Sequence, residues 1–306
     1  TAYEIPKRDW SSDVCSSDLP ANPAKYLGLD PCVINGVSYP VCSTNANLNQ
    51  RRKLTLENPR EGILFGPLDL HNAVGTQDYH GLRLTMTRRS ASGISLSGNY
   101  TLSRCYGTAT PGSFPQNSAG YTNPDDPEFD RGYCVQDRKH LANATMGYQT
   151  PELSNAVARA LASHWRLSGI LSVRSGARLN VISGQDNAMN GISNQRPNQI
   201  SDDVYGGTLL SYLNRTAFSQ PALGTFGNFV FGGVEGPSYW DVNLAVSRLL
   251  QFGASNTLEL RVEIFNLTNN FNWGTPNLNL NSPQFGRITT MAGQPRVMQF
   301  GIKYGF

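Results

Sequence analysis

The last eleven residues, 296–306, limit most strongly what this chain can fold into. Every second position carries a large apolar side chain: Met298, Phe300, Ile302, Tyr304 and Phe306. The residues between them are small or polar, apart from Val297. A period of two is typical of a β-strand, whose successive side chains point to opposite faces. The run is about as long as a tilted strand that crosses a bilayer. It indicates either a half-buried strand or a membrane-spanning one.

The composition of the chain helps to decide between a half-buried strand and a membrane-spanning strand. Charged residues make up 15% of the 306 residues, against about 25% in a typical soluble domain. The chain has 30 Gly and 18 Pro, which favours strands joined by polar loops. No apolar run reaches the roughly 18 residues of a membrane helix. Strands of a membrane barrel are only half apolar, so a search for long apolar runs does not detect them. A net charge of +3 without a Lys/Arg run gives no indication of a nucleic-acid partner.

Six further runs with a period of two precede the last one. They lie at 79–89, 94–103, 140–148, 165–173, 240–247 and 257–264. The second run has a face made of Ser95, Ser97, Asn99, Thr101 and Ser103. A solvated sheet face usually carries Lys and Glu, so this hydroxyl-rich face indicates the wall of a lumen or channel.

The connections between these runs alternate between short or medium and long, as they do in antiparallel membrane barrels. Several long loops would count against a compact soluble domain. We therefore predict an all-β fold, the C-terminal part of an antiparallel transmembrane β-barrel with about seven strands. The expected location is the bacterial outer membrane, in contact with its lipid. The C-terminus is expected in the periplasm and the long loops outside.

The cysteines indicate an oxidising compartment. Cys32 and Cys42 flank a turn signal at residues 35–36, and Cys105 and Cys134 flank a long loop. We predict one disulfide in each pair. Metal binding is the alternative for the first pair, but no further His or Cys stands at ligand spacing. Residues 123–130 offer five oxygen-bearing side chains for calcium, although two prolines favour a solvated turn. We predict no metal and no cofactor.

The first nineteen residues fit no strand or helix pattern. Residues 9–19, read as codons, resemble a widely used short-read sequencing adapter. We interpret residues 1–19 as an artefact outside the fold, Cys15 included, and residues 20–306 as the protein. The genuine start is then expected upstream, which makes the chain a fragment.

Several stretches resemble one family. They are 79–89 continuing to 99–103, then 137–140, 224–228 leading to 236–240, and 261–271 with the terminal Phe306. In this order they are similar to TonB-dependent outer-membrane receptors of the Oar-like, carboxypeptidase-regulatory-domain type. The resemblance implies a barrel of about 22 strands with a plugged lumen. It also implies energy coupling to the TonB complex through an N-terminal part absent here. The terminal strand also resembles that of outer-membrane barrels, which implies that Phe300, Ile302, Tyr304 and Phe306 act as the signal for the assembly machinery.

The resemblance implies transport of an unknown large solute, with the loops capturing it. The loop aromatics Tyr121, Tyr133, Tyr205 and Tyr212, with Phe129 and Phe226, are candidate ligand contacts. The alternative is that they only pack the loops together. A passive porin or an adhesive barrel is the second function. Catalysis is not expected, because the weak pair Asp137 and His140 is the best that the sequence offers.

Overall fold

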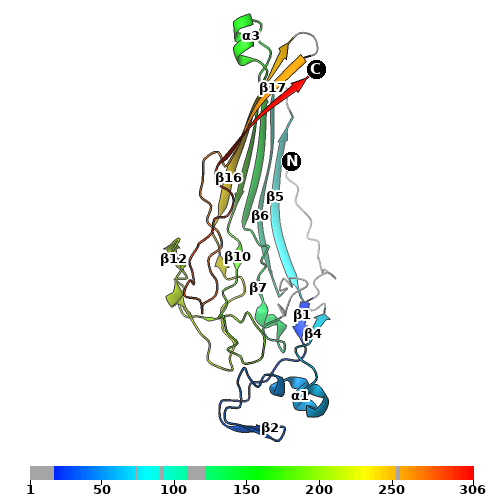
Figure 1. Ribbon diagram of the computed structural model, residues 1–306, viewed down its shortest axis with the longest axis vertical. Helices are drawn as coiled ribbons and strands as arrows, with labels where there is room; N and C mark the ends of the chain where they lie inside the picture. Colours follow the sequence, from blue (N-terminus) through cyan, green and yellow to red (C-terminus); the bar gives the residue numbers. More distant parts are fainter. Residues whose placement is uncertain (1–16, 73–74, 90–92, 109–120, 253–255) are drawn as a thin grey trace.

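The computed structural model describes residues 17–72, 75–89, 93–108, 121–252 and 256–306. Its main element is a sheet of long antiparallel strands in the order β18-β17-β16-β9-β8-β6-β5 (Figure 1). All seven predicted strands are present, and the all-β prediction is confirmed. Their bounds are β5 Gln77–Arg88, β6 Ile94–Gly107, β8 His140–Gln149, β9 Trp165–Arg174, β16 Tyr239–Phe252, β17 Asn256–Phe265 and β18 Val297–Gly305. The short β7, Gly132–Tyr133, adds to the loop end of β6.

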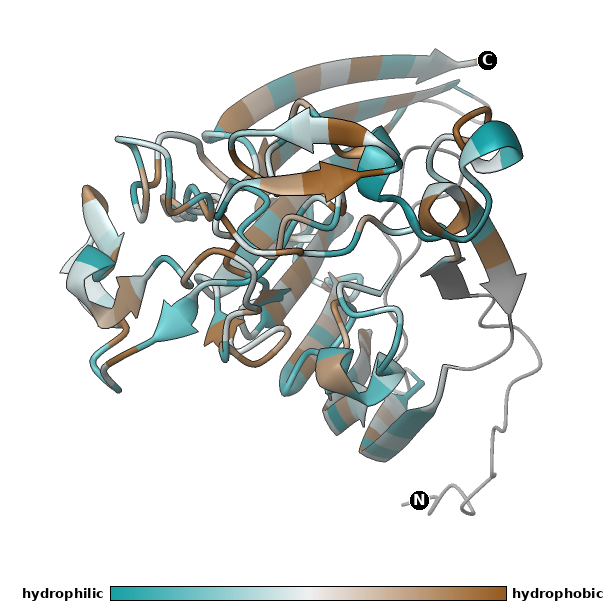
Figure 2. Ribbon diagram, turned by 90° about the horizontal axis from the view of Figure 1, so that it is seen from below, coloured by the Kyte–Doolittle hydropathy of each residue, from teal (hydrophilic) through white to brown (hydrophobic). Residues whose placement is uncertain are grey.

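The strand register joins the apolar sides of neighbouring strands into one continuous face. One row of paired residues crosses four strands through Gly98, Ala144, Leu171 and Val242. Another crosses the last strands through Val246, Val262 and Phe300. The opposite face carries Asn99, Asn143 and Ser172 in register. Apolar and polar residues alternate along the long strands in Figure 2. A slip of one residue in any strand would break both faces.

The apolar face of the sheet is not where the hydrophobic core lies. Phe300 and Ile302 are 77% and 76% exposed. The buried apolar cluster lies instead in the loops and comprises Val181, Leu213, Ala217, Phe218, Phe229, Val234, Leu280 and Phe285. A water-soluble sheet would cover its apolar face, so this arrangement indicates that lipid covers it.

All the long connections meet at one end of the sheet (Figure 1). They join β6 to β8, β9 to β16, and β17 to β18. The other end holds the shorter connections, including helix α3, Ala156–Ala162, between β8 and β9. The Asn155 side chain begins this helix by accepting hydrogen bonds from the amides of Val157 and Ala158. None of the helices in the described part of the chain is long and apolar enough to span a membrane.

Short elements occupy the loops and the segment before β5. This segment contains β1 Ser17–Pro20, β2 Cys32–Ile34, β3 Val37–Tyr39, η1 Asn49–Arg51, α1 Lys53–Glu57, α2 Pro59–Gly62 and β4 Asp69–Asn72. The loops contain η2 Pro127–Asp130, β10 Arg178–Leu179, β11 Asn198–Gln199, β12 Tyr205–Thr208, β13 Ser211–Leu213, η3 Arg215–Ala217, β14 Phe218–Ser219 and β15 Val234–Glu235.

One prediction about the N-terminus needs correction. We expected residues 1–19 to lie outside the fold, but residues 17–19 belong to β1 and pair with β4. Strand β1 has only four residues, Ser-Asp-Leu-Pro, which are too few to show an alternating pattern. Residues 1–16, including Cys15, lie outside the described residues.

Candidate functional site

The long loops fold together with the segment before β5 into what we call the loop layer. It comprises residues 17–72, 121–139, 175–238 and 266–296 of the described chain. Phe218 packs edge-on against Phe229 and Phe285, with ring centroids 5.4 and 5.7 Å apart. These rings come from two different connections between strands, so the apolar cluster holds separate loops together. The layer therefore has a fixed shape at the end of the sheet.

A buried ion pair joins two parts of the loop layer. The Arg196 guanidinium contacts the Asp130 carboxylate, and the two side chains are 2% and 1% exposed. Arg196 also donates to the Phe129 carbonyl at 2.7 Å and lies 4.4 Å from the centre of the Phe129 ring. Burial lowers the pKa of Arg196, while the Asp130 charge raises it. The pair ties η2 to the loop that precedes β16.

This ion pair also bears on the calcium alternative for residues 123–130. The Asp130 carboxylate is directed at Arg196 and also accepts a hydrogen bond from the Thr122 amide. Throughout the part of the chain that is described, His, Cys, Asp and Glu side chains form no group of three suited to a metal. The segment is a turn closed by its own carboxylates, with Asp126 accepting from the Glu128 amide.

Two buried arginines hold the N-terminal segment together, and Arg51 also attaches it to the loop after β9. Arg51 is fully buried and donates to the carbonyls of Thr44 and Met189 at 3.0 and 2.9 Å. Arg52 donates to the Asn22 carbonyl at 2.8 Å. Burial lowers the pKa of both guanidinium groups. Carbonyl oxygens, in place of water, accept the hydrogen bonds of both guanidinium groups. These bonds fix the backbone around the two arginines.

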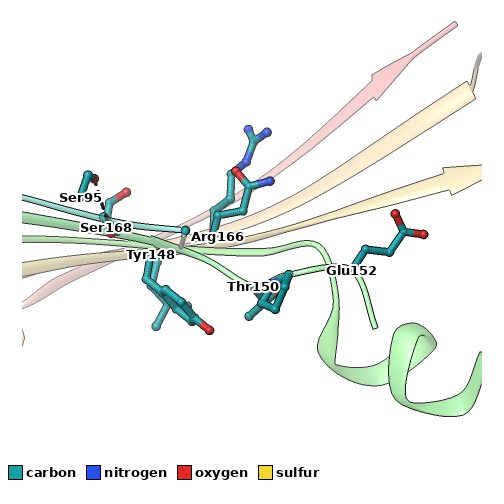
Figure 3. Close-up of a pocket in the computed structure, with 11 residues that line it drawn as sticks. Ser95, Tyr148, Thr150, Glu152, Arg166 and Ser168 are labelled. Carbon is teal, nitrogen blue, oxygen red and sulfur yellow. Dashed lines mark hydrogen bonds between the residues drawn. The ribbon is translucent and has the colours of Figure 1, made fainter. Parts of the chain in front are cut away.

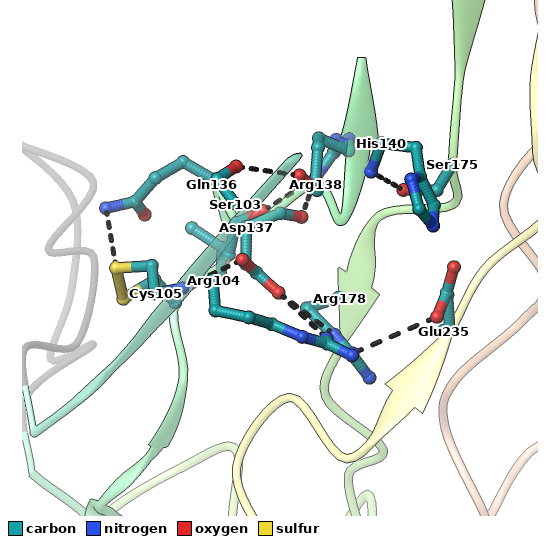
Figure 4. A network of polar contacts seen from close by, with 12 residues as sticks. Ser103, Arg104, Cys105, Gln136, Asp137, Arg138, His140, Ser175, Arg178 and Glu235 are labelled. Carbon is teal, nitrogen blue, oxygen red and sulfur yellow. Dashed lines mark hydrogen bonds and ion pairs between the residues drawn. A yellow bond between two sulfur atoms is a disulfide. The ribbon is translucent and has the colours of Figure 1, made fainter. Parts of the chain in front are cut away.

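Asp137 is the centre of a polar network where the sheet meets the loop layer (Figure 4). Its buried carboxylate accepts from the Cys105 amide at 2.9 Å and from Arg178 Nε at 3.3 Å. Arg104 approaches it at 3.6 Å. Arg178 also lies 3.8 Å from the Glu235 carboxylate. The network joins β6, β10 and β15 around one carboxylate.

His140 does not join this network as a catalytic partner of Asp137. Its ring Nδ1 lies 2.7 Å from the Tyr100 hydroxyl, and its backbone amide donates to the Ser175 hydroxyl. The Asp137 carboxylate is occupied by arginines. The weak pair considered from the sequence is therefore not brought together.

Both predicted disulfides are present and both lie in or beside the loop layer. Cys32 and Cys42 have Cα atoms 5.3 Å apart and close the β2–β3 hairpin. Cys105 and Cys134 have Cα atoms 5.4 Å apart and connect the end of β6 to the loop that follows it. Both distances are usual for disulfides.

The predicted loop aromatics divide into buried and accessible residues. Tyr121 is fully buried, so the hypothesis that it contacts a ligand at the surface does not fit. Tyr133 is half-buried beneath Arg178, whose guanidinium lies 4.0 Å from the ring centre. Tyr205 is 43% exposed and packs edge-on against Tyr212 at 5.8 Å. Phe129 and Phe226 pack against each other at 5.3 Å. Packing between loops accounts for most of these contacts.

Two open hollows lie on the polar face of the described sheet. One, of about 470 Å³, lies at the end near α3 and is lined by Ser95, Glu152, Arg166 and Ser168 (Figure 3). The other, of about 400 Å³, lies near the loop layer. It is lined by Tyr239, Asp241, Asn243 and Gln299. Charged, hydroxyl and amide groups thus face the side opposite the apolar face, as expected for a lumen wall.

The model of one protein family, the outer membrane beta barrel domain, matches residues 18–299. The chain belongs to this family. The membership accounts for the exposed apolar face of the sheet and assigns it to the lipid of the bacterial outer membrane. Phe300, Ile302, Tyr304 and Phe306 then lie on the lipid side of the terminal strand.

No curated protein matches the chain. Among solved structures, it is similar to BauA, the ferric preacinetobactin receptor from Acinetobacter baumannii, with 14% identity and a TM-score of 0.41. The similarity covers 78% of this chain and 23% of that receptor, so the chain spans about a quarter of its length.

Proposed function

We propose that this chain is the C-terminal part of a TonB-dependent outer-membrane receptor of the Oar-like type. It supplies barrel wall and ligand-capturing loops for a large solute and catalyses no reaction. The observation that carries the proposal is the pairing of a lipid-side apolar face with a polar lumen face, beneath a folded loop layer. A receptor needs a rigid capture surface above a polar passage, and this arrangement provides one.

The edges of the sheet favour a larger barrel. In the described chain, β5 pairs only with β6, and β18 pairs only with β17. Open strand edges do not persist in hydrocarbon, because each unpaired backbone group costs several kcal/mol. Further strands from the same protein are the simplest way to close the sheet. Expressed alone, residues 20–306 should aggregate, and a heat-modifiable, protease-resistant monomer in detergent would contradict this.

The proposed orientation places the loop layer outside the cell and the C-terminus in the periplasm. The β2–β3 hairpin and α3 lie at opposite ends of the molecule, so they make a matched pair for labelling (Figure 1). A peptide tag inserted after Gly36 of the full-length protein should bind antibody on intact cells. A tag inserted after Leu161 should bind only after the outer membrane is opened. The reverse pattern would overturn the orientation.

Energy coupling separates the receptor from its alternative, a passive porin or adhesive barrel. The full-length protein, cross-linked in living cells with formaldehyde, should form an adduct with TonB. In planar bilayers it should show no steady conductance, because a plug fills the lumen. A steady open channel without a TonB adduct would favour the porin, and neither signal would favour an adhesive barrel.

A further inference from the structure

A third hollow, of about 350 Å³, lies where β16 enters the loop layer, and nothing above gives it a role. Its lining combines four aromatic rings with small polar side chains. The lining residues are Tyr212, Pro237, Ser238, Trp240, Asn270, Phe271, Asn272 and Trp273. No Asp, Glu, Lys, Arg or His is among them.

The walls of this hollow are held firmly in place. Asn272 binds the backbone of Trp240 on both sides, accepting from its amide at 3.0 Å and donating to its carbonyl at 2.9 Å. Asn270 donates to the same carbonyl at 3.3 Å. Trp273 packs edge-on against Tyr212, with ring centroids 6.3 Å apart. The Trp240 backbone and the rings of Tyr212 and Trp273 are therefore already positioned, so a ligand would lose little affinity to ordering them.

Two rings and several polar atoms remain free for a ligand. Trp240 and Phe271 are 38% and 54% exposed. Within the described part of the chain, the indole N–H of Trp240 and the Ser238 hydroxyl take part in no hydrogen bond. Exposed rings offer a flat apolar surface, and the free donors and acceptors suit hydroxyl groups. A neutral sugar ring combines an apolar face with hydroxyls around its edge, whereas a phosphate would find no cation here.

The position of the hollow indicates where such a sugar would come from. Trp240 lies in the apolar face, in register with Val173 on β9. It is also the apolar-face residue of β16 nearest the loop layer. Aromatic residues at this level of a membrane barrel lie at the boundary between the acyl chains and the headgroups. The hollow therefore opens beside the headgroups of the leaflet that surrounds the loop end.

We propose that this hollow binds the neutral sugar headgroup of an outer-leaflet glycolipid. The sugar ring stacks on Trp240 and Phe271, its hydroxyls bind Ser238 and the indole N–H, and the acyl chains lie along the apolar face. The proposal rests on the orientation given under the proposed function. It is independent of TonB coupling, because binding from the leaflet requires no transport.

The test uses the full-length protein in lipid nanodiscs. One set contains phosphatidylethanolamine alone, and the other adds increasing amounts of monoglucosyl diacylglycerol. Tryptophan emission should change in a saturable way with the glycolipid only. Ser238→Ala and Phe271→Leu should each weaken the apparent affinity at least fivefold. Trp165→Phe is the matched control, because Trp165 lies on the same apolar face near the opposite end of the sheet and should leave the affinity unchanged.

Three outcomes would overturn the proposal. Equal responses with and without the glycolipid would mean that the rings only contact the membrane boundary. Unchanged affinity in both variants, with heat-modifiable folding retained, would place the sugar elsewhere. Competition by soluble methyl β-glucoside at the same concentration would show that the hollow takes free saccharides instead. If the tag experiment placed the loops in the periplasm, the proposed orientation would fail together with this inference. Failure of the binding test alone would leave the orientation and the proposed function standing.

Discussion

The assignment of the two sheet faces can be tested with neighbouring residues of β16. Val246 pairs with Leu167 and Val262 on the apolar face, whereas Ala245 pairs with Ser168 and Glu263 on the polar face. A strand tilted by about 40° rises about 2.6 Å per residue along the membrane normal. Val246 is seven residues from one end of β16 and six from the other, so it lies about 16–18 Å from both ends. It is therefore near the middle of the bilayer.

An arginine at position 246 should lower the free energy of unfolding much more than an arginine at position 245. On the lipid face near the midplane, Val246→Arg should lower the free energy of unfolding by about 2–4 kcal/mol. That is roughly a 25- to 700-fold change in the folding equilibrium. Ala245→Arg places its guanidinium opposite Glu263, where a cross-strand pair of opposite charges returns about 0.2–1 kcal/mol. Its net effect should stay below about 1 kcal/mol.

The measurement is urea unfolding of the full-length protein in lipid vesicles, followed by tryptophan emission. Val246→Leu serves as a control for a change of shape without charge and should stay near the wild-type value. The reasoning would be refuted if the two arginine variants lost equal stability, or if Ala245→Arg lost more. Either result would mean that the polar face does not line a lumen.

Three further predictions concern the loop layer. Asp137→Ala should cost about 3 kcal/mol and should speed proteolysis of the layer, because the buried Arg178 keeps only the more distant Glu235 carboxylate and the Cys105 amide loses its acceptor. Asp78→Ala, which removes an exposed partner of Arg131, should cost under about 1 kcal/mol and is its control. Replacing Cys105 and Cys134 by serine should lower the free energy of unfolding by about 3.6 kcal/mol, because the two cysteines are 29 residues apart. The same change at Cys32 and Cys42, which are 10 residues apart, should lower it by about 2.7 kcal/mol. Thermal unfolding would show which pair contributes more. Burial, with the nearby charges of Tyr205 and Glu235, raises the pKa of Tyr212 above its ordinary value near 10. The unfolded chain therefore loses this proton at a lower pH than the folded chain does. As a result, the stability of the fold decreases as the pH rises above about 10. Tyr212→Phe should flatten this decline in unfolding experiments from pH 8 to 11, and an unchanged slope would count against it.

The sheet and the disulfides were predictable because their signals are local. Each long strand shows its period of two within about ten residues, and each cysteine pair flanks its own loop. The register was not predicted: a slip of one residue would break both faces, but a slip of two would keep them, so the period alone leaves several alignments open. The β1–β4 pair had no such pattern and was missed.

The loop layer was not predictable because its contacts join residues far apart in the chain. Asp130 and Arg196 are 66 positions apart, and Arg51 reaches the Met189 carbonyl across 138. Nothing in a window around either arginine shows that it is buried. The only available signal was the presence of charged residues in loops otherwise rich in Asn, Ser and Gly. The same limit applies to the hollow beside Trp240, which combines residues 212, 237, 238, 240 and 270–273.

The apolar residues of the sheet and those of the loops lie in two different environments. Those of the sheet face lipid and add nothing to a protein core, so the strands depend on backbone pairing and on the membrane. Those of the loops build the buried cluster around Phe218, which buried charges and disulfides reinforce. The loop layer should therefore keep its shape when the lumen changes, as the proposed capture surface would need to. Loss of Asp137 or of a disulfide would then impair ligand capture while leaving barrel assembly intact. This separation would not be expected if the loops owed their shape to the sheet alone.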